Sequence, residues 1–399
     1  MTDRQPTPGP ADLAAMSDLI MPMAIRVAAT LHLADHLADG PLTTTALATR
    51  AGADPSALAR LMQYLVARGL FESASDEEER KEGAADQPRA GRDESAAAGR
   101  DESAAAGRDE SAAAGRDESA GVGRGEGAGV GRGEGAGVER AGGVESGDRG
   151  RFALGDGGRW LLDGAPGSAR KWLDLEGFGG HMDRAFFELL GTVRAGGPVA
   201  AGNKMSLSPG AAESYDELMA ERARAEGPAL AQALNWGRFK HVVDVGGGTG
   251  AQLIALLSAF PHLRGTLVEL PASITTAQQH FTEAGVGCAV LAGDLFELEL
   301  PRADAFVLRY LLHSFEDEQA VEALAKCRKA LDEGGSVLVC EASDASPAVF
   351  ASMDLLMLVL GHGRERTLAQ YDDVAAAAGL TRKAIYHPTA GPRVLEYAV

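Results

Sequence analysis

Long apolar runs are absent from this chain, and cysteine is scarce. No stretch approaches the roughly 18 apolar residues that a membrane-spanning helix requires, and the opening MTDRQPTPGP lacks the basic and apolar regions of a signal peptide. The three cysteines, Cys288, Cys327 and Cys340, cannot all pair with one another, which favours a reducing compartment. We therefore expect a cytoplasmic protein that does not associate with membranes.

Basic residues are also few relative to acidic ones. The chain carries 38 Lys and Arg against 57 Asp and Glu, for a formal net charge of −19. Nucleic-acid binding requires clustered Lys and Arg to neutralise phosphates, so we expect a small-molecule partner and no nucleic acid. With 399 residues, 45% of them hydrophobic, the chain is long enough for two domains with their own cores.

Residues 1–73 predict a mostly helical N-terminal domain. Apolar residues recur at helical spacing over 12–39, interrupted only by Pro22. The following TTTALATRAGADPSALARLMQYLVARGLFES predicts two helices and then a strand, which is a winged-helix pattern. Its second helix offers only Arg60 and Arg68 as basic residues, so DNA recognition is the less favoured interpretation.

Residues 74–149 interrupt this domain with a low-complexity insertion. The unit RDESAAAG recurs from Arg92 and gives way from Val122 to VGRGEGAG. Gly, Ala, Ser and mixed charge offer too little apolar surface to offset the entropy of ordering, so we expect disorder. Beyond the insertion, residues 150–235 predict a second wing strand in GRFALGDGGRWLL, which should pair with the LFES strand across the insertion, and then a helical linker.

Residues 236–399 predict an α/β domain that begins at HVVDVGGGTG, residues 241–250. A valine-rich strand runs into a turn at Gly246 and Gly248, and AQLIALLSAF then returns to helical spacing. Glycines at that junction let a ligand lie against backbone N–H groups. The pattern G-x-G-x-x-A, with Glu269 about 20 residues on, also fits a dinucleotide site. From this loop alone, NAD and S-adenosylmethionine both remain open.

Further strands are predicted after the loop, with helices between the first five of them. They are RGTLVEL, CAVLAGD, DAFVLRYL, SVLVCEA, RKAIYH and RVLEYAV. The alternation predicts a Rossmann-like, doubly wound parallel sheet. Only a short turn separates the last two strands, so the last strand should be antiparallel, which favours a methyltransferase sheet over an NAD sheet.

Three acidic residues stand at predicted strand ends, where an open α/β sheet binds its ligand. They are Asp244, Glu269 and Asp294. Glu269 could accept from both hydroxyls of a ribose, and Asp294 from an adenine amino group, while Leu295 or Phe296 covers the ring.

A candidate base follows the next strand, in RYLLHSFEDEQ. The pKa of an ordinary histidine lies near neutrality, so His313 is suited to remove a proton from a hydroxyl. Glu341 and Glu365 can converge on it and hold its tautomer and charge. Arg309, at the end of the same strand, is counted with the cofactor-binding candidates, and no residue is assigned to a metal.

The motifs DVGGGTG, VELP, AGDLF, YLLHSFEDE and GRERT, in this order behind a winged-helix pattern, resemble the small-molecule O-methyltransferases. The segments LIMPMAIRVAATLHLADHL and LRGTLVELP are similar to the anthracycline branch, of the carminomycin O-methyltransferase and aclacinomycin hydroxylase type. The resemblance implies a homodimer interlocked through the N-terminal helices. It also implies S-adenosylmethionine contacts at Gly246, Gly248, Glu269 and Asp294, with His313 as base between Glu341 and Glu365.

Two departures from the family pattern bear on the activity. Plant-type members follow the histidine with Asp where this chain has Ser314, and anthracycline members lack the histidine. The expected activity is methyl transfer from S-adenosylmethionine to a phenolic hydroxyl of a polycyclic aromatic, polyketide-type metabolite. The alternatives are a homologue that binds the cofactor but catalyses hydroxylation or another non-methylating step, and a cofactor-sensing DNA regulator.

Overall fold

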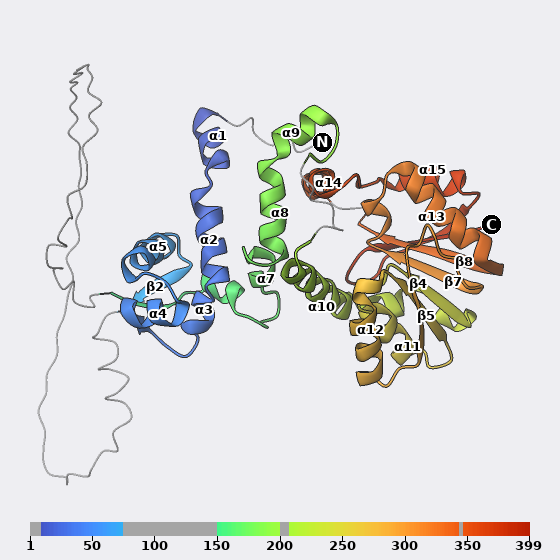
Figure 1. Cartoon of the computed structure of the whole chain (residues 1–399), viewed down its shortest axis with the longest axis horizontal. Helices are drawn as coiled ribbons and strands as arrows, with labels where there is room; N and C mark the ends of the chain where they lie inside the picture. Colours follow the sequence, from blue (N-terminus) through green and yellow to red (C-terminus); the bar gives the residue numbers. More distant parts are fainter. Residues whose placement is uncertain (1–8, 75–149, 200–206, 343–345) are drawn as a thin grey trace, which may run out of the picture.

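The computed structural model describes residues 9–74, 150–199, 207–342 and 346–399. They form three parts along the chain: N-terminal helices with a small sheet, a helical segment, and a C-terminal domain built on a large sheet (Figure 1). The disorder predicted for residues 74–149 concerns, from residue 75 onward, positions outside the described ranges.

The N-terminal part is helical with a small antiparallel sheet. Its elements are α1 (Pro10–Ser17), α2 (Ile20–Thr30), α3 (Leu33–His36), β1 (Leu42–Thr43), α4 (Thr44–Ala51), α5 (Pro55–Ala67), β2 (Phe71–Ala74) and β3 (Arg151–Leu154). In β2 and β3, Phe71 lies opposite Leu154 and Ala74 opposite Arg151, so the predicted pairing across the insertion is confirmed. Naming this arrangement a winged helix stays a prediction.

The breaks among the first helices lie elsewhere than predicted. Pro22 occupies the first turn of α2, where a missing backbone N–H costs no intrahelical hydrogen bond. The breaks fall instead at residues 18–19 and 31–32, and His32 takes a left-handed conformation with φ 50°. The expectation that Pro22 interrupts the helical stretch is therefore wrong.

A helical segment joins the N-terminal part to the sheet domain. It comprises η1 (Gly157–Leu161), α7 (Arg170–Leu173), α8 (Phe178–Phe187), α9 (Leu189–Ala195) and α10 (Pro209–Ala233). The N-cap of α10 is Ser208, and the helix runs from the middle of the molecule to the sheet domain (Figure 1). There Ala220 and Ala223 pack against Ala251, at the start of the helix that follows the glycine loop.

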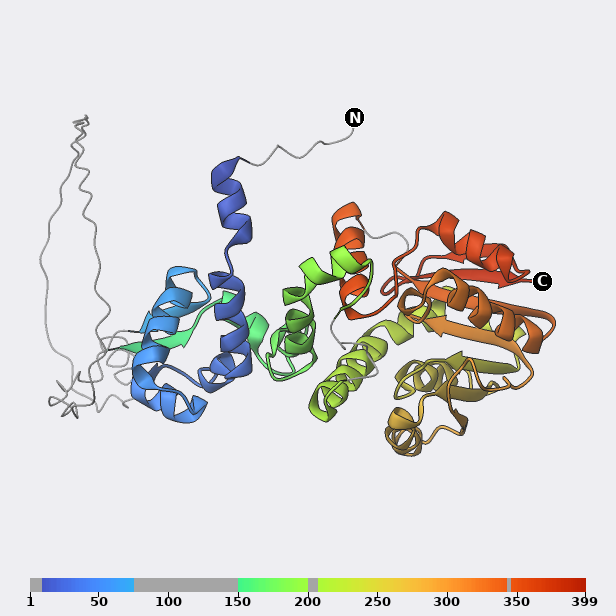
Figure 2. The ribbon, with the colours of Figure 1, turned by 45° about the horizontal axis from the view of Figure 1, so that its top comes forward.

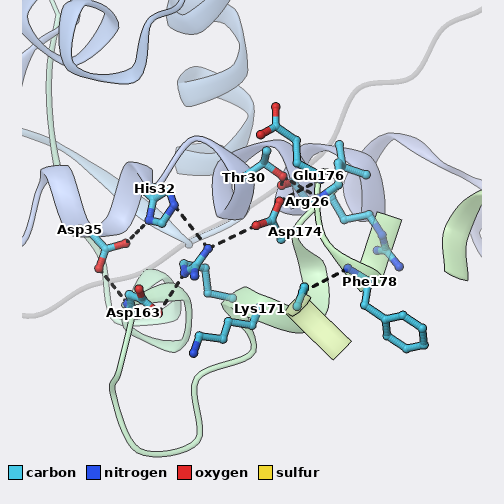
Figure 3. A network of polar contacts seen from close by, with 12 residues as sticks. Arg26, Thr30, His32, Asp35, Asp163, Lys171, Asp174, Glu176 and Phe178 are labelled. Atoms are coloured by element: carbon cyan, nitrogen blue, oxygen red, sulfur yellow. Dashed lines mark hydrogen bonds and ion pairs between the residues drawn. The ribbon is translucent and has the colours of Figure 1, made fainter. Parts of the chain in front are cut away.

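Polar contacts fix α2 and the turn after η1 to α7 and the turn that follows α7 (Figure 3). Thr30 Oγ1 accepts the backbone N–H of Leu175 at 2.8 Å. The buried Arg170 guanidinium lies 3.2 Å from an Asp163 oxygen and 3.6 Å from an Asp174 oxygen. A buried guanidinium is tolerated where carboxylates surround it, so this network orients the N-terminal part on the segment that leads to α10.

The C-terminal domain contains a seven-stranded sheet in the order β6-β5-β4-β7-β8-β10-β9. The sheet domain lies at the opposite end of the molecule from α4 and α5 of the N-terminal part (Figure 2). Its strands are β4 (His241–Val245), β5 (Arg264–Glu269), β6 (Cys288–Ala292), β7 (Ala303–Arg309), β8 (Leu331–Glu341), β9 (Thr381–Tyr386) and β10 (Arg393–Ala398). Strands β4 to β8 pair in parallel, whereas β10 is antiparallel to both β8 and β9. The predicted doubly wound sheet with an antiparallel last strand is confirmed.

Helices cover both faces of this sheet. They are α11 (Ala251–Ala259), α12 (Pro271–Glu283), α13 (Asp317–Ala330) and α15 (Leu368–Ala377), with the short turns η3 (Trp236–Arg238) and η4 (Leu312–Ser314). A further helix, α14 (Pro347–Leu360), packs against α8 and α9 instead. Every residue of β4 is buried. Val243 packs toward Leu324 on α13, while Val242 packs toward Leu253 on α11, because successive side chains of a strand point to opposite faces.

One predicted crossover helix is missing. Residues 293–302, between β6 and β7, form turns and extended chain instead of a helix. The backbone carbonyl of Asp294 accepts the N–H groups of Glu297 and Leu298 at 3.0 and 2.9 Å, which gives one turn only. Pro301 follows closely and provides no backbone N–H to extend a helix.

Within the described ranges, every helix is too short or too polar to cross a lipid bilayer.

Candidate active site

From β4, the chain adds β5 and β6 on one side of the sheet and then β7 and β8 on the other, so β4 is where the strand order reverses. β4 has β5 on one side and β7 on the other. Ligands of open α/β sheets bind beyond the carboxyl ends of the strands at such a switch point. The loop after β4 is therefore the structural candidate for the cofactor site.

Three glycines of this loop adopt backbone angles that favour glycine. Gly246, Gly248 and Gly250 have φ values of 70°, 60° and 79°, a region that residues with a Cβ rarely occupy. A Cβ built at Gly248 would meet no described atom within 4 Å. The loop thus presents open backbone at Gly248, where a ligand can approach closely.

Asp244 lies buried beneath this loop at the end of β4. Its side chain is 2% exposed, and a Cβ at Gly247 would lie 2.4 Å from its Oδ2. Within the described chain, Oδ2 has no hydrogen-bond partner. Burial raises the pKa of Asp244 to about 7, against the lowering effect of the Arg309 guanidinium. This carboxylate can therefore stabilise a positive charge that comes close to it.

Glu269 reaches back to the same loop from the end of β5. Its Oε2 accepts the N–H of Gly248 at 2.8 Å, and its Oε1 accepts the N–H of Leu270 at 2.7 Å. Burial raises the pKa of Glu269, and these two N–H groups partly oppose the rise. Two acidic residues predicted from separate strand ends, Asp244 and Glu269, thus share one loop.

The third predicted acid stands next along the sheet edge. Asp294 Oδ1 accepts the N–H of Phe296 at 2.9 Å, while the Phe296 ring packs edge-on against Phe315, with ring centroids 5.2 Å apart. Leu295 is 9% exposed and belongs to the main core cluster. The two apolar candidates therefore differ: Leu295 is packed in the core, and Phe296 is only partly buried. Their roles toward an adenine ring stay predictions.

Arg309 is hydrogen-bonded to α10 and not to the other cofactor candidates. Its guanidinium pairs with Glu226 on α10, and Glu226 also accepts from Arg222 Nε at 3.0 Å. Arg222 donates to the hydroxyl of Tyr310 at 2.7 Å. The Arg309–Glu226 and Arg222–Tyr310 contacts were not predicted, because in each pair the partners are more than 80 residues apart in sequence and no local motif joins them.

The histidine site forms at the ends of β7 and β8. His313 lies in η4 and is 8% exposed. Its Nδ1 lies 3.0 Å from Glu365 Oε1 and 3.8 Å from Glu341 Oε2. The three side chains that the sequence predicted to converge do lie together in the structure. Their catalytic roles stay predictions.

Glu341 also holds the backbone that carries His313. Its Oε1 accepts the N–H of Leu311 at 3.1 Å and that of Leu312 at 2.9 Å, and its side chain is completely buried. Burial raises the pKa of Glu341, and the neighbouring His313 opposes that rise. One carboxylate thus serves both the turn and the imidazole.

Two residues beside this cluster were not predicted from the sequence. Arg366 is completely buried and donates to the backbone carbonyls of the His313 turn. Asp354 on α14 accepts the N–H of Glu365 at 2.9 Å. The position of Arg366 directly after Glu365, in GRERT, was the available signal, since a charged residue beside a candidate site residue can support it.

An apolar cluster lies where α8, α10 and α14 meet. Phe178 packs against Tyr215, with ring centroids 4.7 Å apart. Partly buried methionines surround it, namely Met182, Met219 and Met353. Methionine adapts its shape and makes favourable contacts with aromatic rings. Because α14 also carries Asp354, this cluster adjoins the histidine site.

Fold and site together define the class. A parallel sheet ending in an antiparallel hairpin, a glycine loop after its first strand and acids at the next two strand ends are the parts of an S-adenosylmethionine-dependent methyltransferase. The residues present fit that cofactor, because the loop is open at Gly248 and the buried Asp244 is complementary to a positively charged ligand.

Comparison with known proteins identifies the family. Residues 196–381 match an O-methyltransferase domain, and residues 13–85 match an O-methyltransferase dimerisation domain. The chain is 32% identical over 380 residues to the aclacinomycin 10-hydroxylase RdmB of Streptomyces purpurascens, covering 92% of this chain and 82% of the relative. It is 31% identical over 393 residues to a 2,7-dihydroxy-5-methyl-1-naphthoate 7-O-methyltransferase of Streptomyces carzinostaticus, covering 96% of each.

A solved structure agrees with these relatives. NcsB1, an O-methyltransferase from neocarzinostatin biosynthesis, superposes with a TM-score of 0.74 at 30% identity and covers 98% of this chain and 100% of its own. Its structure contains S-adenosyl-L-homocysteine and 1,4-dihydroxy-2-naphthoic acid. The chain belongs to the S-adenosylmethionine-dependent O-methyltransferase family and carries that family's dimerisation domain.

Proposed function

We propose that this enzyme methylates a phenolic hydroxyl of a polycyclic aromatic, polyketide-type metabolite, with His313 as general base. The observation that carries the proposal is the 3.0 Å contact between His313 Nδ1 and Glu365 Oε1. To donate to a carboxylate, Nδ1 must carry the proton, which leaves Nε2 as the proton acceptor.

His313 and its two carboxylates are suited to take a proton from a phenol. As the imidazole becomes positively charged, Glu365 at 3.0 Å and Glu341 at 3.8 Å stabilise that charge. S-adenosylmethionine, when bound, supplies an electrophilic methyl group. Asp244, Gly248, Glu269 and Asp294 would hold it, so that the phenolate oxygen and the methyl group are brought into line.

The acceptor class is supported by the apolar cluster and by the relatives. A site adjoining Phe178, Met182, Met219 and Met353 favours a flat, apolar ring system. The Streptomyces carzinostaticus relative is named for a dihydroxylated naphthoate, and NcsB1 was solved with a dihydroxynaphthoic acid. We therefore propose fused aromatic rings with at least one phenolic hydroxyl as the acceptor.

The test is a product assay with S-adenosylmethionine and a panel of phenolic naphthoates and anthracyclines. We expect a product heavier by one methylene group, and His313→Ala should lower its rate by roughly 10² to 10⁴. An unchanged rate in that variant would contradict general-base catalysis, and only positioning of the acceptor would remain.

A non-methylating activity is the second candidate, because the relative RdmB is named as a hydroxylase. The same assay separates the two, since hydroxylation adds one oxygen and leaves the cofactor's methyl group in place. A product that gains oxygen but no methylene would overturn the proposed methyl transfer.

We also propose that the enzyme is a homodimer. Apolar side chains of the first helices are exposed in the single chain: Leu13, Met16, Leu19 and Ile20 are 56%, 74%, 60% and 63% exposed. An exposed apolar patch of this kind is typical of an association surface. Light scattering should give twice the chain mass of 41.3 kDa; a monomer that is fully active would contradict the proposal.

A further inference from the structure

Side chains on two sides of the turn that carries His313 hydrogen-bond to its backbone. Residues 312–314 form the short helix η4, and Glu341 accepts backbone N–H groups on one side of it. On the other side, Arg366 Nη1 donates to the carbonyl of Leu312 at 2.8 Å, and Nη2 donates to the carbonyl of Phe315 at 2.8 Å. The two bonded carbonyls directly flank His313 and Ser314.

Arg366 is held in that orientation by its own partner. Its Nε donates to Asp317 Oδ1 at 2.9 Å, and Asp317 is the first residue of α13. The guanidinium is planar and carries five donors in a fixed fork. It therefore fixes the end of η4 and the start of α13 in one geometry, which a lysine ammonium would not reproduce.

The backbone beside Arg366 lies against the same turn. A Cβ built at Gly363 would lie 2.2 Å from the carbonyl oxygen of His313 and 2.9 Å from Ser314 Cα. Only a residue without a Cβ allows this approach unless the turn moves. The contact at Gly363 and the hydrogen bonds from Arg366 thus act on neighbouring peptide units of the same turn through different physical means.

We propose that Arg366 is a positioning residue for His313, which sets the imidazole against Glu365 by fixing the turn through its two carbonyls. Arg366 and Glu365 are adjacent in sequence, so one short segment supplies both the carboxylate that orients the ring and the guanidinium that orients the ring's backbone. The kinetic consequence rests on the proposed role of His313, but the geometric claim does not.

The test measures the tautomer of His313 directly, without an acceptor. Nitrogen-15 NMR of histidine-labelled enzyme, with the His313 signals assigned by their loss in His313→Ala, reports which ring nitrogen carries the proton. In the wild type we expect the proton on Nδ1. In Arg366→Lys, which keeps the charge but loses the fork, we expect a mixture of the two tautomers.

Two further variants separate positioning from general stability. Arg364→Lys is the matched control: Arg364 lies on the same segment and contacts the same Asp317 at 3.3 Å, but it is 48% exposed, so the tautomer should not change. Gly363→Ala alters no charge and should give the same mixed tautomer as Arg366→Lys. Calorimetric affinity for S-adenosylmethionine should stay within about twofold of wild type in all three, which shows that the fold is intact.

Turnover of any acceptor that gains a methyl group should fall by roughly 10² in Arg366→Lys with little change in the KM for the cofactor, as expected for a misplaced catalytic group. An unchanged tautomer in both Arg366→Lys and Gly363→Ala would overturn the proposal. If His313→Ala retains full activity, the general-base function fails, while the tautomer still decides whether Arg366 positions the ring.

Discussion

Three carboxylates lie at the ends of β4, β5 and β6, those of Asp244, Glu269 and Asp294. Among the described residues, Glu269 and Asp294 accept hydrogen bonds only from backbone N–H groups, and Asp244 Oδ2 has no hydrogen-bond partner. At the ends of β7 and β8, by contrast, the carboxylates lie against His313, with the buried guanidinium of Arg366 beside them. We call the first group the cofactor half and the second the acceptor half.

This difference separates two kinds of chemistry within one sheet edge. In the cofactor half, among the described residues, no side-chain cation is hydrogen-bonded to these carboxylates, although the Arg309 guanidinium lowers the pKa of Asp244. Their negative charge suits a sulfonium compound with an amino group. In the acceptor half, the negative charge of Glu341 and Glu365 is offset when the imidazole is protonated, which suits the removal of a proton.

The largest effect on the cofactor half is expected from Glu269→Gln. A carboxylate accepts charge-assisted hydrogen bonds from vicinal hydroxyls, worth about 1.5 to 3 kcal/mol each when buried. Glutamine keeps the size but brings an amide donor toward the N–H groups of Gly248 and Leu270. Calorimetric titration with S-adenosylmethionine should show at least a tenfold loss of affinity, or about 1.4 kcal/mol.

The matched control for that variant is Glu299→Gln, the same change at an exposed position. Its affinity for the cofactor should equal that of the wild type. If Glu269→Gln binds S-adenosylmethionine as tightly as the control, the ribose does not depend on Glu269, and the comparison of the two halves loses its main support.

The cofactor half could be predicted from the sequence because its parts are local. Val242 to Val245 and the glycines that follow specify strand, turn and helix within one short stretch. Asp244, Glu269 and Asp294 each follow an apolar strand, and parallel strands bring their carboxyl ends to one edge. The strand order is therefore the only long-range information needed to predict that these strand-end acids lie close together.

The acceptor half was predicted only in part, because its support is long-range. The convergence of His313, Glu341 and Glu365 follows from strand ends, but the bond from Arg366 to Leu312 joins residues 54 positions apart. The pairing of Arg309 with Glu226 depends on how α10 lies across the sheet edge. The positions of the breaks among the first helices, and the absence of a helix at residues 293–302, were predicted wrongly. Each is decided by the conformation of one turn, which the spacing of apolar residues does not reveal.

A smaller effect, on pH dependence, would sharpen the comparison further. Burial raises the pKa of Asp244 to about 7, so the carboxyl is largely protonated below that pH and ionised above it. A positively charged ligand favours the ionised form. Binding of S-adenosylmethionine should therefore release a proton near neutrality, and its affinity should rise with pH through this window and then level off.

From about pH 8 down to about pH 6.5, the ionised fraction of a group with this pKa falls about fourfold, and the cofactor affinity should fall by no more than that. Calorimetric titration over this range, in buffers of different ionisation enthalpy, measures both the affinity and the released proton. Asp244→Asn cannot titrate at this position, so it removes the Asp244 contribution and leaves those of Glu269 and of the cofactor's own amino group. If wild type and Asp244→Asn show the same pH dependence, Asp244 does not sense the cofactor's charge, and the negative charge of the cofactor half must act through Glu269 and Asp294.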